Sequence, residues 1–368
     1  MTAAVEVAEV AVAAEVAVAV VVAVTDMVCN EKNRLLLQFH ITGICNLRCK
    51  HCYRTDGNVE PLKYEDVIAV IEQFKTLLVR YNTHYNIKKR GHINITGGEP
   101  FIRCDINAIL KYLGANRDLF SYGILSNGSF IDDNIIKLLK ETEVSFVQLS
   151  IDGDRKTHDF LRKEGDYKRV FKTAKNLESK GVRTYISFTA NKNNYKFLPK
   201  VARECRKRKI TKLWSDRIVP IGNGENLKTL AITPDILPHY LKTLKKSQGN
   251  VLTKWLFPKT TVTMNRALQF MEGGNMYVCS AGDSLITVDE YGNILPCRRM
   301  PIVCGNVFEN TLENIYFENA VFKDLRHKTI PKECSKCLYR YFCMGGAKCQ
   351  SFAIYNDYRH CDAGCNLI

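Results

Sequence analysis

The first 26 residues contain no lysine or arginine and consist almost wholly of Ala, Val and Glu. A secretory signal begins with a basic region, so this composition predicts that no such signal is present. The longest uninterrupted apolar stretch of the segment runs from Val16 to Val24, which is too short to span a bilayer. We therefore predict a cytoplasmic protein with no membrane partner, in which residues 1–34 form a low-complexity segment.

The sequence also lacks internal repeats of solenoid period, and no aromatic-interleaved basic motif accompanies its basic runs. The formal net charge is nevertheless +15, concentrated in runs such as Arg206-Lys207-Arg208-Lys209. Nucleic acid is therefore not an expected partner. A charge of this size attracts acidic partners at long range, so we expect an acidic peptide or an anionic small substrate. We also expect an electron donor such as flavodoxin or ferredoxin.

Cysteine is abundant, with 15 residues. An odd count without an export signal argues against a disulfide framework and favours metal or cluster ligation in a reducing compartment. Cys45, Cys49 and Cys52 occur at C-x3-C-x2-C spacing and supply three thiolates. A [4Fe–4S] cube needs four ligands, so three thiolates leave one iron free to bind a small molecule. A zinc site with a remote fourth ligand, or simply buried thiols, are the alternatives.

The size of 368 residues and the hydrophobic content of 46% fit about two domains. Between residues 35 and about 219, short apolar runs alternate with amphipathic stretches, which is typical of βα units around a parallel sheet. The expected strands are Leu35–Ile41, His92–Thr96, Tyr122–Ser126, Phe146–Ile151, Thr184–Thr189 and Lys212–Val219. Six strands of an α/β protein fit a partial barrel.

Helical periodicity separates these strands. The expected buried positions are Val67, Ile71, Phe74 and Leu78 in one helix and Ile131, Ile135, Leu138 and Leu139 in another. A third helix runs from Tyr167 to Lys180 and is closed by Gly181. In such a barrel the loops after the strands meet at one rim, so the motifs that follow the strands should converge there.

The second strand ends in Thr96-Gly97-Gly98-Glu99-Pro100, whose glycines allow close backbone approach to a ligand. Alone, this run is equally compatible with an ordinary turn. Together with the cysteine spacing it resembles the radical S-adenosylmethionine (SAM) superfamily. In that family the open iron chelates SAM, and one electron from the cluster cleaves SAM to a 5′-deoxyadenosyl radical.

This resemblance implies a partial (β/α)6 TIM-type barrel over residues 35–225, with SAM and a SAM-binding [4Fe–4S] cluster as cofactors. It makes Cys45, Cys49 and Cys52 the catalytic cluster ligands. The implied SAM contacts are His51 for adenine, Gly97, Gly98 and Glu99 for the ammonium group, Ser126 and Ser150, Arg162 for the carboxylate, and Ser187 for the ribose. A surface ion pair is the alternative role for Arg162.

Residues 226–276 are expected to form a bridging region, and the cysteine-dense residues 277–368 resemble the SPASM module, which carries auxiliary [4Fe–4S] clusters. The usual module has three residues between the last two cysteines of its central group, whereas this chain has five, Met344 to Lys348. The resemblance implies one cluster held by Cys334, Cys337, Cys343 and Cys365 and another held by Cys279, Cys297 and Cys349.

Three possibilities are open for the fourth ligand of the second cluster. It is Cys304, it is Cys361, or the protein supplies none and the open iron accepts a substrate thiolate. A zinc ribbon built on the Cys334 group is the alternative without clusters. We expect Cys29, Cys104 and Cys205 to lie outside these sites.

Radical SAM/SPASM proteins most often modify peptides, so the resemblance implies an oxidoreductase that installs a crosslink, thioether or related modification in a ribosomally made peptide with an acidic leader. Radical decarboxylation of a haem precursor and formation of formylglycine in a sulfatase are alternatives. A non-catalytic iron–sulfur protein is the alternative from a different class. Asp216 and Arg217, at the end of the sixth strand, are expected either to contact substrate or to form an internal ion pair.

Overall fold

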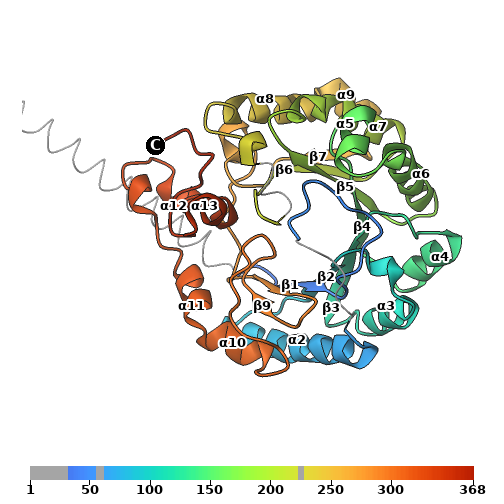
Figure 1. Ribbon diagram of the computed structural model, residues 1–368, viewed down its shortest axis with the longest axis vertical. Helices are drawn as coiled ribbons and strands as arrows, with labels where there is room; N and C mark the ends of the chain where they lie inside the picture. The colour runs from blue at the N-terminus through green and yellow to red at the C-terminus, as the bar shows by residue number, and fades with distance from the viewer. Residues whose placement is uncertain (1–31, 55–61, 223–227) are drawn as a thin grey trace, which may run out of the picture. The chain divides into compact units, whose positions relative to one another are not determined.

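A computed structural model describes residues 32–54, 62–222 and 228–368 of the chain. Most of the low-complexity segment, Cys29 included, lies outside the described residues. The chain divides into residues 1–33 and a compact unit of residues 34–368, and the second unit contains the whole sheet (Figure 1).

One sheet of nine strands runs through this unit in the order β7-β6-β5-β4-β3-β2-β1-β8-β9. All neighbours are parallel except β8 and β9. The strands are β1 (Leu36–His40), β2 (Gly91–Thr96), β3 (Phe120–Leu125), β4 (Phe146–Ser150), β5 (Thr184–Ala190), β6 (Lys212–Arg217), β7 (Thr261–Thr263), β8 (Leu285–Val288) and β9 (Ile294–Leu295). The six expected strands are thus confirmed as β1 to β6.

Three strands extend the expected six. β7 lies in the predicted bridging region and pairs with β6. β8 and its antiparallel partner β9 lie in the cysteine-rich tail, and β8 pairs in parallel with β1, with Leu36 opposite Leu285. The tail therefore shares the sheet of the barrel, which fixes its first hairpin beside the strand that precedes the cysteine motif.

Helices lie between the strands and after the last of them. They are α2 (Tyr64–His84), α3 (Ile106–Ala115), α4 (Asp133–Glu141), α5 (Arg155–Leu161), α6 (Asp166–Ser179), α7 (Leu198–Lys207), α8 (Leu237–Ser247), α9 (Val251–Leu256), α10 (Leu312–Glu318), α11 (Ala320–His327), α12 (Arg340–Cys343) and α13 (Lys348–Tyr355). The strands curve in an arc, with the loop after β1 on the inner side and α10 to α13 where the arc is open (Figure 1).

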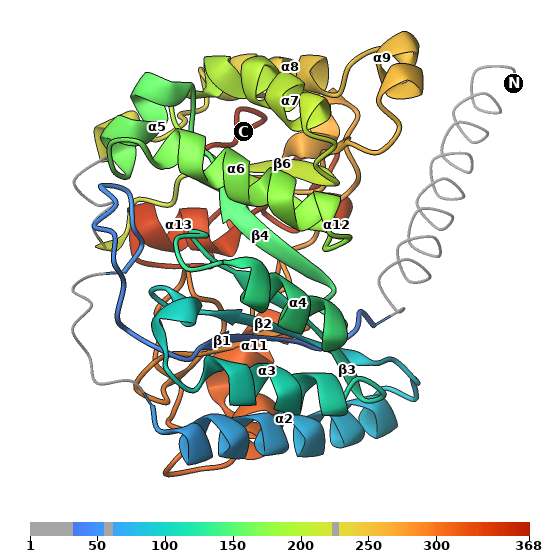
Figure 2. The same ribbon diagram turned by 90° about the vertical axis from the view of Figure 1, so that its right-hand side faces the viewer.

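Helices α2, α3, α4, α6 and α7 lie one beside another on the outer face of this arc (Figure 2). α2 buries Val67, Ile71, Phe74 and Leu78, as their spacing predicts. Helix α6 ends before Gly181, whose φ of +86° is the left-handed conformation that glycine adopts without strain. Among the described residues, no helix combines the length and the apolar character needed to cross a bilayer.

Helix α4 begins directly after Asp132. The Asp132 carboxylate caps it by accepting a hydrogen bond from the Ile135 backbone N–H at 2.8 Å. The buried residues of the helix are Ile136 and Leu139, whereas Ile135 and Leu138 are only partly buried against the core. The buried face is therefore rotated from the expected one, which included Ile135 and Leu138.

The end of β6 holds the cysteine-rich tail through buried polar contacts. Arg217 donates two hydrogen bonds to the Asp362 carboxylate, at 2.7 and 2.6 Å, and both side chains are at most 2% exposed. The Gln350 side-chain amide donates to the Ile218 carbonyl at 3.0 Å. Arg217 thus forms an internal ion pair, the second of its two expected roles.

We predict that Arg217→Gln lowers the free energy of unfolding by about 3–5 kcal/mol, because removing one partner leaves the other charge buried without compensation. Urea unfolding of the anaerobically purified protein measures this change. The matched control is Arg359→Gln, since Arg359 is 65% exposed in its ion pair with Asp324, and its loss should cost no more than about 1 kcal/mol. Equal effects of the two substitutions would contradict the prediction.

Candidate functional site

The cysteine motif lies in the loop that follows β1, at the carboxyl end of the sheet. The thiols of Cys45, Cys49 and Cys52 are partly buried and line a cavity of about 210 Å³ together with residues from the ends of β2 to β6. Burial raises the pKa of Cys49 to about 11, against the opposing charge of the Arg162 guanidinium. The Cys49 thiol is therefore protonated until an electropositive ligand displaces its proton.

The two glycines after β2 make room for the cysteine loop. A Cβ on Gly97 would lie 2.2 Å from the Thr42 carbonyl oxygen, and one on Gly98 would lie 2.1 Å from that of Ile44. The Gly98 N–H donates to the Thr42 carbonyl at 2.8 Å. Both glycines line the cavity. A side chain is excluded at these positions by the backbone of the cysteine loop, whether or not a ligand also lies close.

The Glu99 carboxylate is fully buried behind the cavity wall. One oxygen accepts hydrogen bonds from the Ser126 hydroxyl at 2.7 Å and the Phe101 N–H at 3.2 Å. The other accepts from the Asn127 N–H at 2.7 Å. Burial raises the pKa of Glu99 to about 6, although these hydrogen bonds favour the ionised form. In this geometry Glu99 fixes the end of β3 against the turn that follows β2.

Serines at the ends of three successive strands face the cavity, as the sequence predicts for Ser126, Ser150 and Ser187. The Ser126 hydroxyl also accepts the Gly128 N–H at 2.8 Å, so its position is fixed from both sides. Gln148 of β4 lines the same wall. The expected convergence of strand ends is therefore present.

Asp152 organises the opposite part of the site. This fully buried carboxylate accepts the Arg162 Nε–H at 2.6 Å and the Thr189 N–H at 2.9 Å, and it lies 3.2 Å from His51 Nε2. Burial alone would raise the pKa of Asp152, but Arg162 and His51 hold it well below its usual range. The ion pair of Arg162 is thus a buried one, and its Nη1 lies 3.8 Å from the Cys49 sulfur.

The position of His51 leaves one of its ring nitrogens without a partner. Nε2 lies 3.2 Å from the Asp152 carboxylate and 3.5 Å from Arg162 Nη2, and because the shorter contact needs a donor on the ring, we assign the proton to Nε2. Nδ1 is then a hydrogen-bond acceptor, and it is buried without a partner among the described residues. Since His51 lines the cavity, a ligand that donates a hydrogen bond here would satisfy this nitrogen.

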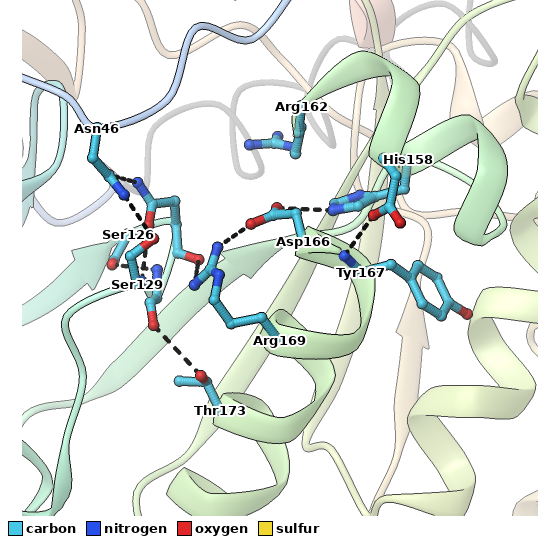
Figure 3. A network of polar contacts seen from close by, with 12 residues as sticks. Asn46, Ser126, Ser129, His158, Arg162, Asp166, Tyr167, Arg169 and Thr173 are labelled. Carbon is cyan, nitrogen blue, oxygen red and sulfur yellow. Dashed lines mark hydrogen bonds and ion pairs between the residues drawn. The ribbon is translucent and has the colours of Figure 1, made fainter. Parts of the chain in front are cut away.

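A second layer of polar residues supports the strand ends (Figure 3). Arg169 pairs with Asp166 and donates to the Asn127 carbonyl at 3.1 Å. His158 Nδ1 accepts the Asp152 N–H at 3.1 Å, so Nε2 carries the proton and donates to Asp166 at 3.0 Å. These positioning residues form no motif, and the sequence analysis missed their role because their contacts join α5 and α6 to the loops after β3 and β4.

On the other side of the cavity, Arg299 donates to the Asp216 carboxylate at 2.6 Å. Asp216 accordingly forms an internal ion pair, as Arg217 does. Arg299 lies in the tail and lines the cavity with its neighbour Arg298. The cavity therefore has one wall from the strand ends and another from the tail.

The tail thiols fall into two groups. Those of Cys334, Cys337, Cys343, Cys361 and Cys365 line one small pocket. Those of Cys279, Cys297 and Cys349 pack against a different apolar cluster around Met300. Cys304 joins neither group: it packs against the main core, and its sulfhydryl donates to the Ile302 carbonyl at 3.5 Å.

Of the two cysteine candidates for the fourth ligand, Cys361 thus lies with the wrong group and Cys304 with none. In the part of the chain that the structure describes, no three His, Cys, Asp or Glu side chains converge on a single-ion position. A cube distributes its thiolates over separate iron atoms, so its ligands stand farther apart than those of one ion. The expected bystanders also lie outside both groups: Cys205 is buried on α7 and Cys104 is exposed.

Comparison with known families identifies two domains in the chain. Residues 39–205 match the Radical SAM superfamily. Residues 279–338 match the SPASM family, described as an iron–sulfur cluster-binding domain. The first range contains the cysteine loop and the ends of β1 to β5, and the second contains Cys279, Cys297, Cys334 and Cys337.

Full-length relatives are distant. Mycofactocin maturase MftC of Mycolicibacterium smegmatis is 23% identical over 334 residues, which cover 86% of this chain and 79% of that protein. An AdoMet-dependent heme synthase of Methanosarcina barkeri is 23% identical over 341 residues, covering 88% of this chain and 93% of that protein. The crystal structure of Streptococcus suis SuiB bound to precursor peptide SuiA has a TM-score of 0.66 at 18% identity, over 89% of this chain and 75% of that one.

We predict a pH-dependent stability that depends on Glu99. Because its pKa rises from 4.5 to about 6 on folding, the folded state holds this proton more tightly than the unfolded state. The stabilisation is complete below pH 4.5 and is lost as the pH rises through about 6, a decrease of about 2 kcal/mol in the free energy of unfolding. Urea unfolding at a series of pH values measures it.

In Glu99→Gln this decrease should be absent, whatever the stability of the variant at a single pH. The control is Glu141→Gln, which removes an exposed carboxylate from α4 and should leave the pH dependence of the parent protein. A parent slope that persists in Glu99→Gln would show that another group titrates.

Proposed function

Because the chain belongs to the radical SAM superfamily and carries a C-terminal SPASM domain, we propose that it is an oxidoreductase that cleaves SAM and modifies a ribosomally made peptide. The observation that carries the proposal is the single cavity lined by three thiols and by polar strand ends. SAM and [4Fe–4S] clusters are the cofactors of this architecture. When bound, they supply reductive cleavage of SAM to a 5′-deoxyadenosyl radical, which abstracts hydrogen from the substrate.

The residues of the cavity fit these groups. Cys45, Cys49 and Cys52 would hold three irons of a cube and leave the fourth iron without a cysteine ligand from this motif. The buried, unpartnered Nδ1 of His51 suits a donor such as the amino group of adenine. Gly97, Gly98, Ser126, Ser150 and Ser187 would contact the rest of SAM.

Two of the expected SAM contacts act differently in this geometry. Glu99 lies behind the wall and would position Ser126 rather than bind the ammonium group itself. Arg162 is held by Asp152 through Nε, so only its Nη atoms remain for the carboxylate of SAM.

The auxiliary clusters would use the two tail groups. Cys334, Cys337, Cys343 and Cys365 would ligate one cluster, with Cys361 as a fifth thiol at the same pocket. Cys279, Cys297 and Cys349 would ligate the other. Since Cys304 packs elsewhere, we propose that one iron of the latter cluster has no cysteine ligand from this group.

A peptide substrate is supported by the relatives named as maturases and by the net charge of +15, which suits an acidic leader and an acidic electron donor. The heme synthase relative, matched over nearly its whole length, favours a second candidate: radical decarboxylation of an anionic tetrapyrrole. Both substrates are compatible with a basic cavity.

We predict that Cys45→Ala abolishes formation of 5′-deoxyadenosine from SAM with dithionite as reductant. It should also lower the iron content by about four atoms per chain, because one of three cubes is lost and the auxiliary clusters remain. Chromatography and iron analysis measure the two effects. Cys104→Ala is the matched control, since this exposed thiol lies outside all three groups. Cleavage that survives Cys45→Ala would refute the assignment.

The substrate class is tested by mass spectrometry. With a short Cys- or Gly-rich peptide encoded beside the gene, we expect loss of two hydrogen atoms from the peptide, as a crosslink or thioether requires. The Cys45→Ala protein is the inactive control. Loss of carbon dioxide from an iron-bound coproporphyrin, with the peptide unchanged, would instead establish the tetrapyrrole reaction.

A further inference from the structure

Arginine dominates the charged lining of the cavity. The six arginines of the lining are Arg48, Arg54, Arg162, Arg217, Arg298 and Arg299. No aspartate or glutamate of the described residues lines the cavity. The surface presented to a ligand is therefore cationic.

Four of these guanidinium groups form ion pairs with carboxylates that do not line the cavity. The pairs are Arg54 with Glu290, Arg162 with Asp152, Arg217 with Asp362, and Arg299 with Asp216. Arg48 donates to the carbonyl oxygens of Cys45 and Leu47. Each of these five guanidinium groups thus already has a carboxylate or a carbonyl oxygen of the protein as its partner.

Arg298 differs from all five. Among the described residues it makes no hydrogen bond and no ion pair, and its recorded contact is with the Tyr53 ring, whose centroid lies 5.4 Å away. The side chain is partly buried. A guanidinium in this setting lacks both a counter-charge and hydrogen-bond acceptors, and a carboxylate supplies both through two parallel hydrogen bonds.

The surroundings of Arg298 separate it from the group around Arg162. Arg298 follows β9 in the tail and lies beside Tyr53, whose hydroxyl is 3.4 Å from His40 Nε2. His40 in turn contacts Glu290 of the same tail hairpin. Arg162, by contrast, lies against Cys49 and His51. Both guanidinium groups thus contact the cysteine loop, but Arg298 reaches it from the tail, whereas Arg162 follows α5.

We propose that Arg298 binds a carboxylate of the substrate, which makes an acidic side chain or the carboxyl terminus of the peptide the group that enters the cavity. The inference rests on the proposed function and names the chemical class that the site accepts. SAM also has a carboxylate, but the Nη atoms of Arg162 remain available for it, which leaves Arg298 for the substrate.

The test uses the anaerobic holoenzyme and phenylglyoxal, which modifies guanidinium groups, with peptide mass spectrometry to locate each adduct. We expect Arg298 to react without added ligand and to be protected by glutarate. A site with a millimolar Kd would slow modification about tenfold at about 10 mM glutarate. Glutaramide, its neutral analogue, and SAM alone should not protect. Arg203, exposed on α7, reports the reagent and should react equally throughout.

Three results would overturn the proposal. Failure of Arg298 to react in the ligand-free holoenzyme would show that a cluster or a protein group already occupies it. Protection by SAM alone would assign the carboxylate to SAM, and equal protection by glutaramide would remove charge as the basis of binding. Failure of the proposed function is recognised separately, because the same preparation would then form no 5′-deoxyadenosine from SAM.

Discussion

The Asp362 carboxylate joins the cysteine-rich tail to the carboxyl end of the sheet. Besides its two bonds from Arg217, it accepts the N–H groups of Ala347 and Gly364, at 2.9 and 3.0 Å. A Cβ on Gly346 would lie 2.5 Å from that of Asp362, and Gly346 has a φ of +76°. One buried anion therefore fixes the loop after Cys343, the turn before Cys365 and the end of β6, so the position of this thiol pocket relative to the cavity depends on it.

A second buried anion connects the tail to the cysteine motif itself. Glu290 lies two residues beyond Val288, which pairs with Phe39 in the sheet. Its carboxylate contacts His40 and Arg54, on either side of the three thiols in sequence. The register of β8 on β1 thus sets where the tail wall meets the cysteine loop, and hence the width of the cavity between them.

Local pattern was sufficient to predict β1 to β6 and the rim motifs, because buried parallel strands are apolar runs and their loops share one edge. It did not reveal β7 or β8, since strands of three and four residues carry little pattern and form only by pairing with distant segments. The hydrogen bonds of Glu99 were missed for a related reason: its partners, Ser126 and Asn127, follow a different strand. Sequence spacing likewise could not predict which thiol group Cys304 or Cys361 joins, because this depends on how remote segments of the chain pack together.

Most buried polar groups around the cavity have hydrogen-bond or ion-pair partners within the protein. The groups that lack a partner indicate the chemistry of the ligands that bind there. Within the described part of the chain, His51 Nδ1 is an acceptor without a donor, and Arg298 is a cation without an anion. Burying either group without a partner costs free energy, and ligand binding recovers that cost. If SAM supplies the donor and the substrate supplies the carboxylate, each ligand relieves a different deficit. The two ligands would then not compete for the same protein group.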